Sequence, residues 1–185
     1  RQVFDLEWNQ SANGKERSIP HFPFEIIEIG AVKLNEAFQM VDEFHRLIRP
    51  QVYTQMHHAI SEVTHMDMKE LRNSGELFPD AAADFLSWCG GDAVFCTWGN
   101  MDLLELQRNM DYYHMDNPFP KPLFYYDVQK LYGLFCRENA RISLDSAVEE
   151  QNLMEERPFH RALDDAYYTG KLLTMLGQAP GPDAI

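Results

Sequence analysis

Two carboxylates interrupt residues 4–8 (FDLEW), a stretch near the start of the chain that otherwise has the pattern of a buried strand. Because successive strand side chains point to opposite faces, Asp5 and Glu7 project from the same face of any sheet that contains them. Two like charges so close repel, and burying even one ionised carboxylate without a partner is costly. The pair therefore indicates either an edge strand with a polar face or a site where a hard divalent cation neutralises both acids.

The composition limits the classes of protein that the chain can represent. Its 185 residues, 45% apolar and 12% aromatic, predict one folded domain at residues 1–177, with a frayed tail at 178–185. The formal net charge of −13 argues against broad, non-specific binding to nucleic acid. That objection weakens if several acids gather around divalent ions, because bound cations reverse the local sign of the charge.

The cysteines and the apolar runs bear on the cellular compartment. Cys89, Cys96 and Cys136 are an odd number without metal-type spacing, which predicts reduced thiols in the core. No membrane-length apolar run and no signal-peptide pattern is visible, so we predict a cytoplasmic protein with no membrane partner. The chain begins abruptly at Arg1, next to the first expected strand, which leaves open whether further residues of that strand precede it.

Hydrophobic patterning predicts strands that alternate with helices after the first strand. Segment 9–21 is a polar loop, either a lid or a plain connection, and segment 50–68 is expected to be irregular. The expected strands cover residues 25–34, 41–48, 93–98 and the start of 121–136, and the expected helices cover 78–89, 101–113, 128–136, 142–152 and 160–176. This order predicts an α/β domain with a mixed sheet flanked by helices.

Several polar residues within this framework allow two interpretations. Glu28 lies inside the apolar strand 25–34, and pairing with a neighbouring group at a strand end is the favoured interpretation. Asp102 follows a strand at the start of a helix, where a carboxylate can also act as a cap. The three histidines of segment 50–68 lack the spacing of a closed zinc site, and solvated loop positions are expected for them. They are His57, His58 and His65.

The last expected helix opens with His160, Arg161, Ala162 and Leu163, followed by Asp164 and Asp165. Helical geometry alone favours the pairing of His160 with Asp164. The ordered set of Asp5-x-Glu7, Asp102 and His160-x4-Asp165 resembles the DEDDh family of 3′-to-5′ exonucleases. The flanking segments EIIEIGAVKL, VDEFHRLIRP and TWGNMD support the resemblance, which covers nearly the whole chain.

The resemblance implies an RNase H-like fold with a mixed central sheet of about five strands. It also implies that four acids hold two Mg²⁺ or Mn²⁺ ions, namely Asp5, Glu7, Asp102 and Asp165. The chemistry agrees, since phosphodiester hydrolysis needs an activated water and compensation of charge on the leaving oxygen, which two metals supply. His160 is then expected to be the general base, and Asp164 a neighbour that orients the helix or the histidine.

By the same resemblance, the 3′-terminal nucleotide lies between the first strand and segment 60–66. Trp8, Thr64 and Met66 are the candidate contacts to its base, with core packing as the favoured role for each. His65 stands where the family commonly has glycine, which puts close backbone approach to the nucleotide in doubt.

The expected substrate is the 3′ end of single-stranded RNA, because the layout looks most similar to RNA-interference-enhancing exoribonucleases and their bacterial relatives. A DNA exonuclease of the proofreading type is the alternative, since contacts to the 2′-hydroxyl are not visible in the sequence. A third hypothesis is a catalytically weak nucleic-acid-binding domain of the same fold, which the presence of all five expected side chains disfavours.

Overall fold

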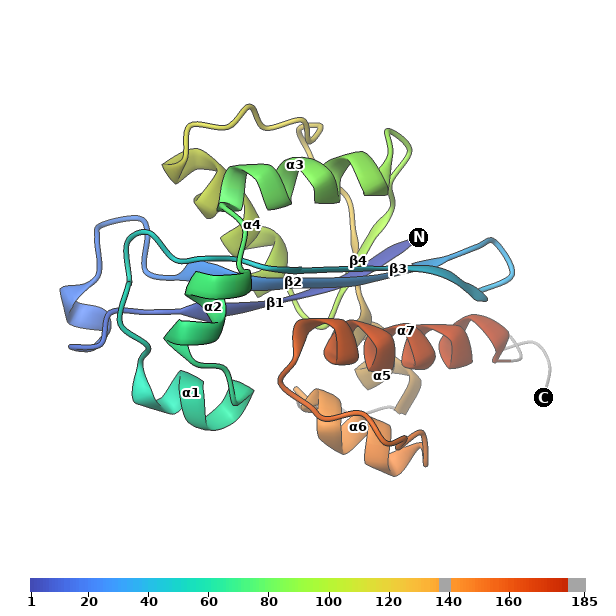
Figure 1. The fold of residues 1–185 in the computed structure, drawn as a ribbon. Coiled ribbons are helices and arrows are strands. Elements are labelled where there is room, and N and C mark those ends of the chain that lie inside the picture. The colour runs from blue at the N-terminus through green and yellow to red at the C-terminus, as the bar shows by residue number, and fades with distance from the viewer. Residues whose placement is uncertain (137–140, 180–185) are drawn as a thin grey trace.

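Five strands form one mixed sheet in the order β3-β2-β1-β4-β5, and helices cover both of its faces (Figure 1). The computed structural model describes residues 1–136 and 141–179. The strands are β1 (Gln2–Asn9), β2 (Glu25–Leu34), β3 (Met40–Leu47), β4 (Phe95–Thr97) and β5 (Tyr126–Asp127). The helices are α1 (His58–Thr64), α2 (Met68–Ser74), α3 (Phe78–Cys89), α4 (Met101–Tyr112), α5 (Val128–Cys136), α6 (Leu144–Glu150) and α7 (Ala162–Gln178), with a 3-10 turn η1 (Lys15–Arg17).

The strand directions follow from the lengths of the connections. β1, β2 and β3 are antiparallel neighbours, whereas β4 and β5 run parallel to β1 and are reached through helices. β2 is buried along almost its whole length, because helices cover both of its faces. The predicted mixed sheet flanked by helices is therefore confirmed.

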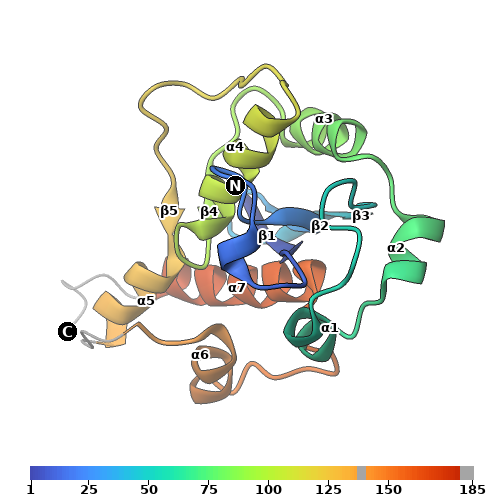
Figure 2. The same cartoon turned by 90° about the vertical axis from the view of Figure 1, so that its left-hand side faces the viewer.

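The two faces of β1 have different chemistry. Phe4 and Leu6 point into the main core under α3 and α4, where Phe4 packs against Phe85 of α3 at 5.4 Å between ring centroids. Val3 belongs to the apolar cluster beneath α7, so Asp5 and Glu7 project from that same face, as strand alternation requires. Figure 2 shows α3 and α4 on one side of the sheet and α7 on the other.

A β-bulge interrupts the pairing of β1 with β2. Glu7 pairs with Glu28 and Trp8 pairs with Ile26, so Ile27 is the extra residue on β2. Ile27 packs against α1 and α2 in a cluster with Met66 and Leu71, whereas Ile26 belongs to the core beneath α3 and α4. The bulge thus lets β2 contribute side chains to the α1–α2 cluster and to the acid-bearing face at successive positions.

The prediction that residues 50–68 are irregular is wrong for the second half of that segment. It contains α1 and the start of α2, each seven residues long, which is too short for a clear hydrophobic period. Local polar bonds define both helices: Asn9 accepts the N–H of His57 at the start of α1, and Asp67 caps α2 by accepting the N–H of Glu70.

Other predicted boundaries differ by a few residues. The strand expected at 93–98 is limited to β4, and the last helix begins at Ala162 instead of residue 160 and ends at Gln178 instead of residue 176. Of the predicted tail at 178–185, residues 180–185 lie outside the described residues. The division into a domain at 1–177 and a tail stays a prediction.

The loop at residues 9–21 is tied to the segment before α1 at both of its ends. The side-chain amide of Asn9 donates to the carbonyl oxygens of Tyr53 and Gln55 at 2.9 Å. The Tyr53 hydroxyl donates to the carbonyl oxygen of Phe22 and accepts the N–H of Ile19. A lid role for this loop stays a prediction.

The cysteines are free, and burial raises the pKa of Cys89 and Cys96 to about 12, as expected of core thiols. Within the described ranges no helix has the length and apolar character needed to cross a membrane.

Candidate active site

Three predicted acids from the two ends of the chain meet on the α7 face of the sheet. Asp5 and Glu7 come from β1, and Asp165 comes from the first turns of α7. Each offers a carboxylate oxygen, and these oxygens all lie within 4.8 Å of one another. The structure therefore brings together residues that are about 160 positions apart in sequence, as the helix packs across β1.

The fourth predicted acid, Asp102, reaches the same strand from α4. Its Oδ1 atom accepts the backbone N–H of Leu6 at 3.1 Å, and the side chain is buried. Leu6 lies between the two acids of β1, so this bond fixes Asp102 beside them. Asp102 also lies in the first turn of α4, after the N-cap residue Asn100, so its position near the helix N-terminus agrees with the capping interpretation as well.

His160 and Asp165 hold one another through the backbone. The N–H of His160 donates to both carboxylate oxygens of Asp165, at 3.1 and 3.2 Å. His160 has a φ of 64°, a left-handed conformation that is unusual for a residue other than glycine, and its side chain is exposed. Asp164 instead forms an ion pair with Arg157 on the outer side of α7.

Burial raises the pKa of all four acids, and no neighbouring positive charge among the described residues cancels this effect. Burial raises the pKa of Asp5 well above its ordinary value, and the neighbouring carboxylates of Asp102 and Glu7 raise it further. Burial and Asp165 raise the pKa of Glu7 to about 8. Burial also raises the pKa of Asp102 and Asp165 to about 7, against their backbone hydrogen bonds. Burial and mutual repulsion thus disfavour the simultaneous ionisation of the four carboxylates, and a bound cation would relieve both.

The donor set of this cluster fits hard divalent cations. All of the converging ligands are carboxylate oxygens, which Mg²⁺ and Mn²⁺ prefer, whereas zinc favours nitrogen and sulfur. Within residues 1–136 and 141–179, the triad of Asp5, Glu7 and Asp165 is the one group that meets the geometric requirements for metal binding. His57 and His58 lie with their rings 4.6 Å apart outside this group.

The predicted substrate contacts differ in accessibility. Trp8 is half-buried at the end of β1, with its ring 5.5 Å from that of Phe24. Thr64 is buried, and its hydroxyl donates to the carbonyl oxygen of Ile60. Met66 is fully buried in the α1–α2 cluster and presents no surface to a nucleotide in this conformation.

His65 occupies a position that suits glycine. It caps the end of α1 with a φ of 57°, in the left-handed region that glycine adopts without steric cost. The glycine that is common here in the DEDDh family therefore has a conformational explanation, and His65 adopts the same backbone conformation.

Glu28 and its partner Arg161 lie beside the acid cluster, and neither was assigned to the site from the sequence. Glu28, directly opposite Glu7, accepts hydrogen bonds from His45 and Arg161. The expectation that Glu28 pairs with a neighbour is confirmed, although it lies within β2 and not at its end. The signal in the sequence was an acid inside an apolar strand; its partners are remote in sequence and leave no local pattern.

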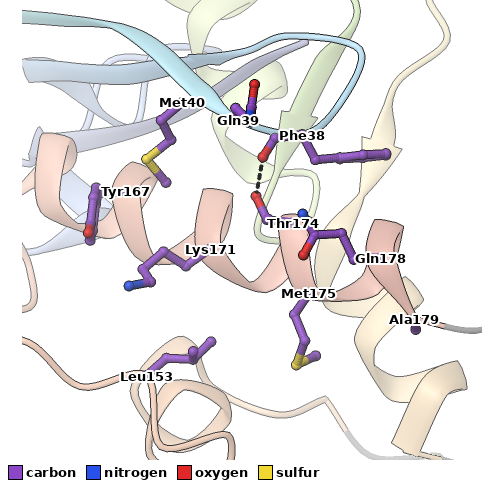
Figure 3. A pocket seen from close by; sticks show the side chains of 10 residues that line it. All are labelled: Phe38, Gln39, Met40, Leu153, Tyr167, Lys171, Thr174, Met175, Gln178 and Ala179. Carbon is purple, nitrogen blue, oxygen red and sulfur yellow. Dashed lines mark hydrogen bonds between the residues drawn. The ribbon is translucent and has the colours of Figure 1, made fainter.

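A separate cavity of about 630 Å³ lies between the second half of α7 and the turn joining β2 to β3 (Figure 3). It is mainly apolar, and neither His160 nor any of the four acids lines it. Its lining residues are Phe38, Gln39, Met40, Leu153, Tyr167, Lys171, Thr174, Met175, Gln178 and Ala179.

The strand order, with acids from β1, α4 and α7 gathered around β1, is the arrangement of an RNase H-like nuclease of the DEDDh type. Comparison with known families agrees. The exonuclease family (RNase T) matches residues 3–173, and the chain belongs to this family. The predicted family, the RNase H-like fold and the assignment as a nuclease hydrolase are thus confirmed.

Curated relatives share moderate identity. A probable 3′-5′ exonuclease, KapD of Bacillus subtilis, is 28% identical over 186 residues, which cover 95% of this chain and 83% of KapD. A PolC-type DNA polymerase III of Thermotoga petrophila is 32% identical over 148 residues, which cover 80% of this chain and 10% of the polymerase.

Solved structures share the fold at lower identity. A 3′-exonuclease that recognises the 3′ end of a histone mRNA stem-loop superposes with a TM-score of 0.79 at 21% identity, over 96% of this chain and 63% of that one. The nuclease domain of 3′hExo, a DEDDh family member bound to rAMP, gives a TM-score of 0.76 at 22% identity, over 95% of this chain and 90% of that one.

Proposed function

We propose that the protein is a metal-dependent 3′-to-5′ exonuclease that releases nucleoside monophosphates from single-stranded nucleic acid, with RNA as the favoured substrate. The observation that carries this proposal is the convergence of the oxygens of Asp5, Glu7 and Asp165 within 4.8 Å, where Asp165 is buried and the two acids of β1 are half-buried. KapD, named a probable 3′-5′ exonuclease, supports the direction of cleavage. The fold shared with exonucleases that recognise an mRNA stem-loop or bind rAMP supports RNA.

The acids would hold two Mg²⁺ or Mn²⁺ ions, with Asp102 completing the set through its place beside Leu6. Bound divalent ions polarise a phosphodiester, lower the pKa of an attacking water and compensate charge on the leaving 3′ oxygen. The contribution of the chain is to converge four carboxylates from three elements before substrate arrives, so that little reorganisation is needed during the reaction. The raised pKa values are consistent with ligands that need a cation.

His160 would accept the proton of the attacking water at an imidazole nitrogen, since histidine is the side chain that most often acts as a general base. Its exposed side chain is free to meet solvent and substrate, and its backbone bond to Asp165 links it to the acid cluster. The left-handed backbone at His160 supports this role, since strained residues persist at functional sites.

DNA is the alternative substrate, favoured by the 32% identity to a PolC-type DNA polymerase III. The same acids and histidine serve either nucleic acid, so the difference must come from contacts to the 2′-hydroxyl. A catalytically weak binding domain is a further alternative, which the convergence of the acids disfavours.

Digestion of matched RNA and DNA oligonucleotides, labelled at the 5′ end, tests the proposal. We expect progressive shortening from the 3′ end with Mg²⁺ or Mn²⁺, faster on RNA, and complete loss on chelation. Equal activity in excess chelator would refute the metal-dependent mechanism, and faster digestion of DNA would favour the alternative substrate.

The variant His160→Ala tests the role of the histidine separately. Loss of a general base is expected to lower kcat by about 10²–10⁴-fold, with Mn²⁺ affinity within about threefold of the wild type. Wild-type kcat in this variant, measured at saturating oligonucleotide, would exclude His160 as the base.

A further inference from the structure

The first turn of α7 is bound to β2 through one buried carboxylate. Glu28 is 1% exposed, and its oxygens accept bonds from the Arg161 Nε and Nη2 atoms, the closest at 2.8 Å. A second donor is the backbone N–H of Ala162, at 3.0 Å, and a third is His45 Nε2 of β3, at 2.7 Å. Two of these three donors belong to the start of α7, so Glu28 joins that helix to the sheet.

Backbone contact reinforces this link two residues further along β2. A Cβ atom at Gly30 would lie 2.0 Å from the backbone nitrogen of Leu163 and 2.1 Å from the carbonyl carbon of Ala162. Such distances are far inside van der Waals contact, and the atoms concerned are backbone atoms that cannot rotate away. Only glycine at this position allows α7 to approach the sheet so closely.

The register of β1 with β2 places the attachment of α7 next to the acids of β1. Glu28 pairs directly with Glu7 across the β1–β2 ladder, and Gly30 pairs with Asp5. The two residues that hold the start of α7 are thus the immediate neighbours of the two acids of β1. Asp165 lies one helical turn after the attached residues, at the point where its oxygen comes within 4.8 Å of the other two.

We propose that Glu28, acting with Arg161 across the close contact at Gly30, is a positioning residue that sets the distance between Asp165 and the acids of β1. Divalent-metal affinity at the site then depends on Glu28 although Glu28 is not itself a ligand. This inference rests on the proposed function in one respect, namely that the acid cluster binds divalent ions.

Stability alone does not account for a carboxylate at this position. Glu28 raises the repulsion on Asp5, Glu7 and Asp165, so it adds a negative charge where four are already crowded. Replacing a buried ion pair by well-packed apolar residues is often neutral or stabilising. The arrangement has a different advantage: the planar fork of Arg161 and a backbone N–H fix the helix in angle as well as distance.

The opposite end of α7 offers a matched control. The Thr174 hydroxyl donates to the carbonyl oxygen of Phe38 at 2.8 Å and so joins the second half of the helix to the turn between β2 and β3 (Figure 3). Thr174→Val removes one helix-to-sheet hydrogen bond, as Glu28→Gln weakens another, but it does so far along the helix from Asp165.

Calorimetric titration of the nucleic-acid-free protein with Mn²⁺ tests the proposal. Glu28→Gln is expected to weaken Mn²⁺ binding by about 10–100-fold, the usual effect of removing a group that orients a metal ligand. Arg161→Lys keeps the charge but loses the planar fork, and we expect a weakening of about three- to tenfold. Thr174→Val is expected to leave the affinity within about twofold of the wild type.

Hydrogen exchange and kinetics on the same variants separate positioning from general destabilisation. In Glu28→Gln, amides of residues 162–166 should exchange faster while those of 170–177 stay unchanged, and kcat on oligonucleotide should fall at saturating metal with KM within about threefold. Wild-type Mn²⁺ affinity in both Glu28→Gln and Arg161→Lys would overturn the proposal. So would an equal loss of affinity in Thr174→Val.

The outcomes also distinguish this inference from the proposed function. If the wild type binds Mn²⁺ but digests no oligonucleotide, the proposed activity fails and the titration still decides the role of Glu28. If Glu28→Gln does not fold, Arg161→Lys and its exchange pattern decide it. If the wild type digests oligonucleotides and both variants keep wild-type metal affinity, only the positioning role fails.

Discussion

Two groups of buried acids lie on the same sheet, and their surroundings differ. Glu25 and Glu28 of β2 are each 1% exposed and are met by hydrogen-bond donors. Glu25 accepts three backbone N–H groups and the hydroxyl of Tyr113, and Glu28 accepts His45, Arg161 and a backbone N–H. The acids of the cluster, Asp5, Glu7, Asp102 and Asp165, mainly face one another, and their pKa values are raised.

The contrast in pKa follows from those partners. Burial acts to raise the pKa of Glu28, but its bonds to His45, Arg161 and the Ala162 N–H outweigh burial and hold the value below the ordinary one. In the cluster, burial and mutual repulsion act in the same direction. Burial alone therefore does not mark a functional acid; a buried acid that faces other acids does.

The largest expected effect comes from neutralising one acid of the cluster. Asp5→Asn should lower exonuclease activity by at least about 10²–10³-fold, since one group that organises transition-state charge is lost. The same change should raise the Tm of the metal-free protein by about 2–4 °C at pH 8, because repulsion is relieved. Oligonucleotide digestion and thermal unfolding measure the two effects, and a lower metal-free Tm would contradict the comparison.

Glu25→Gln is expected to lower the Tm and to leave the exonuclease activity nearly unchanged, the reverse of Asp5→Asn. Here an ionised acceptor of backbone N–H groups is lost, at a cost of about 2 kcal/mol, and the Tm should fall by roughly 4–8 °C. Activity per folded molecule should stay within about threefold, because Glu25 contacts neither the acid cluster nor His160. Loss of activity with an unchanged Tm would instead show that Glu25 acts together with the acid cluster.

The smallest effect is the pH dependence of stability without metal. Acids whose folded-state pKa is raised stabilise the fold below their unfolded pKa near 4, and this contribution is lost as pH rises through the folded values. For Glu7 at about 8 and for Asp102 and Asp165 at about 7, the metal-free Tm should fall as the pH rises from 5 to 8.

The difference between the wild type and Asp5→Asn over that range isolates the cluster from other titrating groups. We expect the variant to show a shallower fall in Tm, and added Mg²⁺ to remove most of the fall in the wild type. Parallel curves for the two proteins would show that the acids of the cluster do not repel one another.

The sequence predicted well those elements whose own residues specify them. The apolar run of β2 and the helical period of α3, ended by Gly90 and Gly91, gave bounds that agree with the structure. Short elements stabilised by remote side chains were not predicted. α1 depends on Asn9, some 50 positions away, and no periodicity within seven residues reveals that bond.

For the candidate site, the sequence identified which residues belong together but not how they are held. The ordered acids and one histidine carry the resemblance to the DEDDh family, and this resemblance grouped Asp5 with Asp165. Asp102 was placed correctly at a helix start, but its bond to the Leu6 N–H of β1 joins residues far apart in the sequence and leaves no local pattern. The sequence marked Glu28 as an acid inside an apolar strand. Its partner Arg161 could not be predicted, because the two residues meet only when α7 packs on β2.

The β-bulge also bears on where this chain can change in length. Removing Ile27 would leave the pairing of Glu7 with Glu28 and of Trp8 with Ile26 in step, at the cost of a buried side chain of the α1–α2 cluster and of the carbonyl oxygen that accepts the Ile48 N–H. Adding a residue between Glu28 and Gly30 would instead turn a side chain toward the backbone of α7. A deletion at the bulge thus keeps the register of β1 with β2, whereas an insertion between Glu28 and Gly30 disrupts the packing of α7 on the sheet.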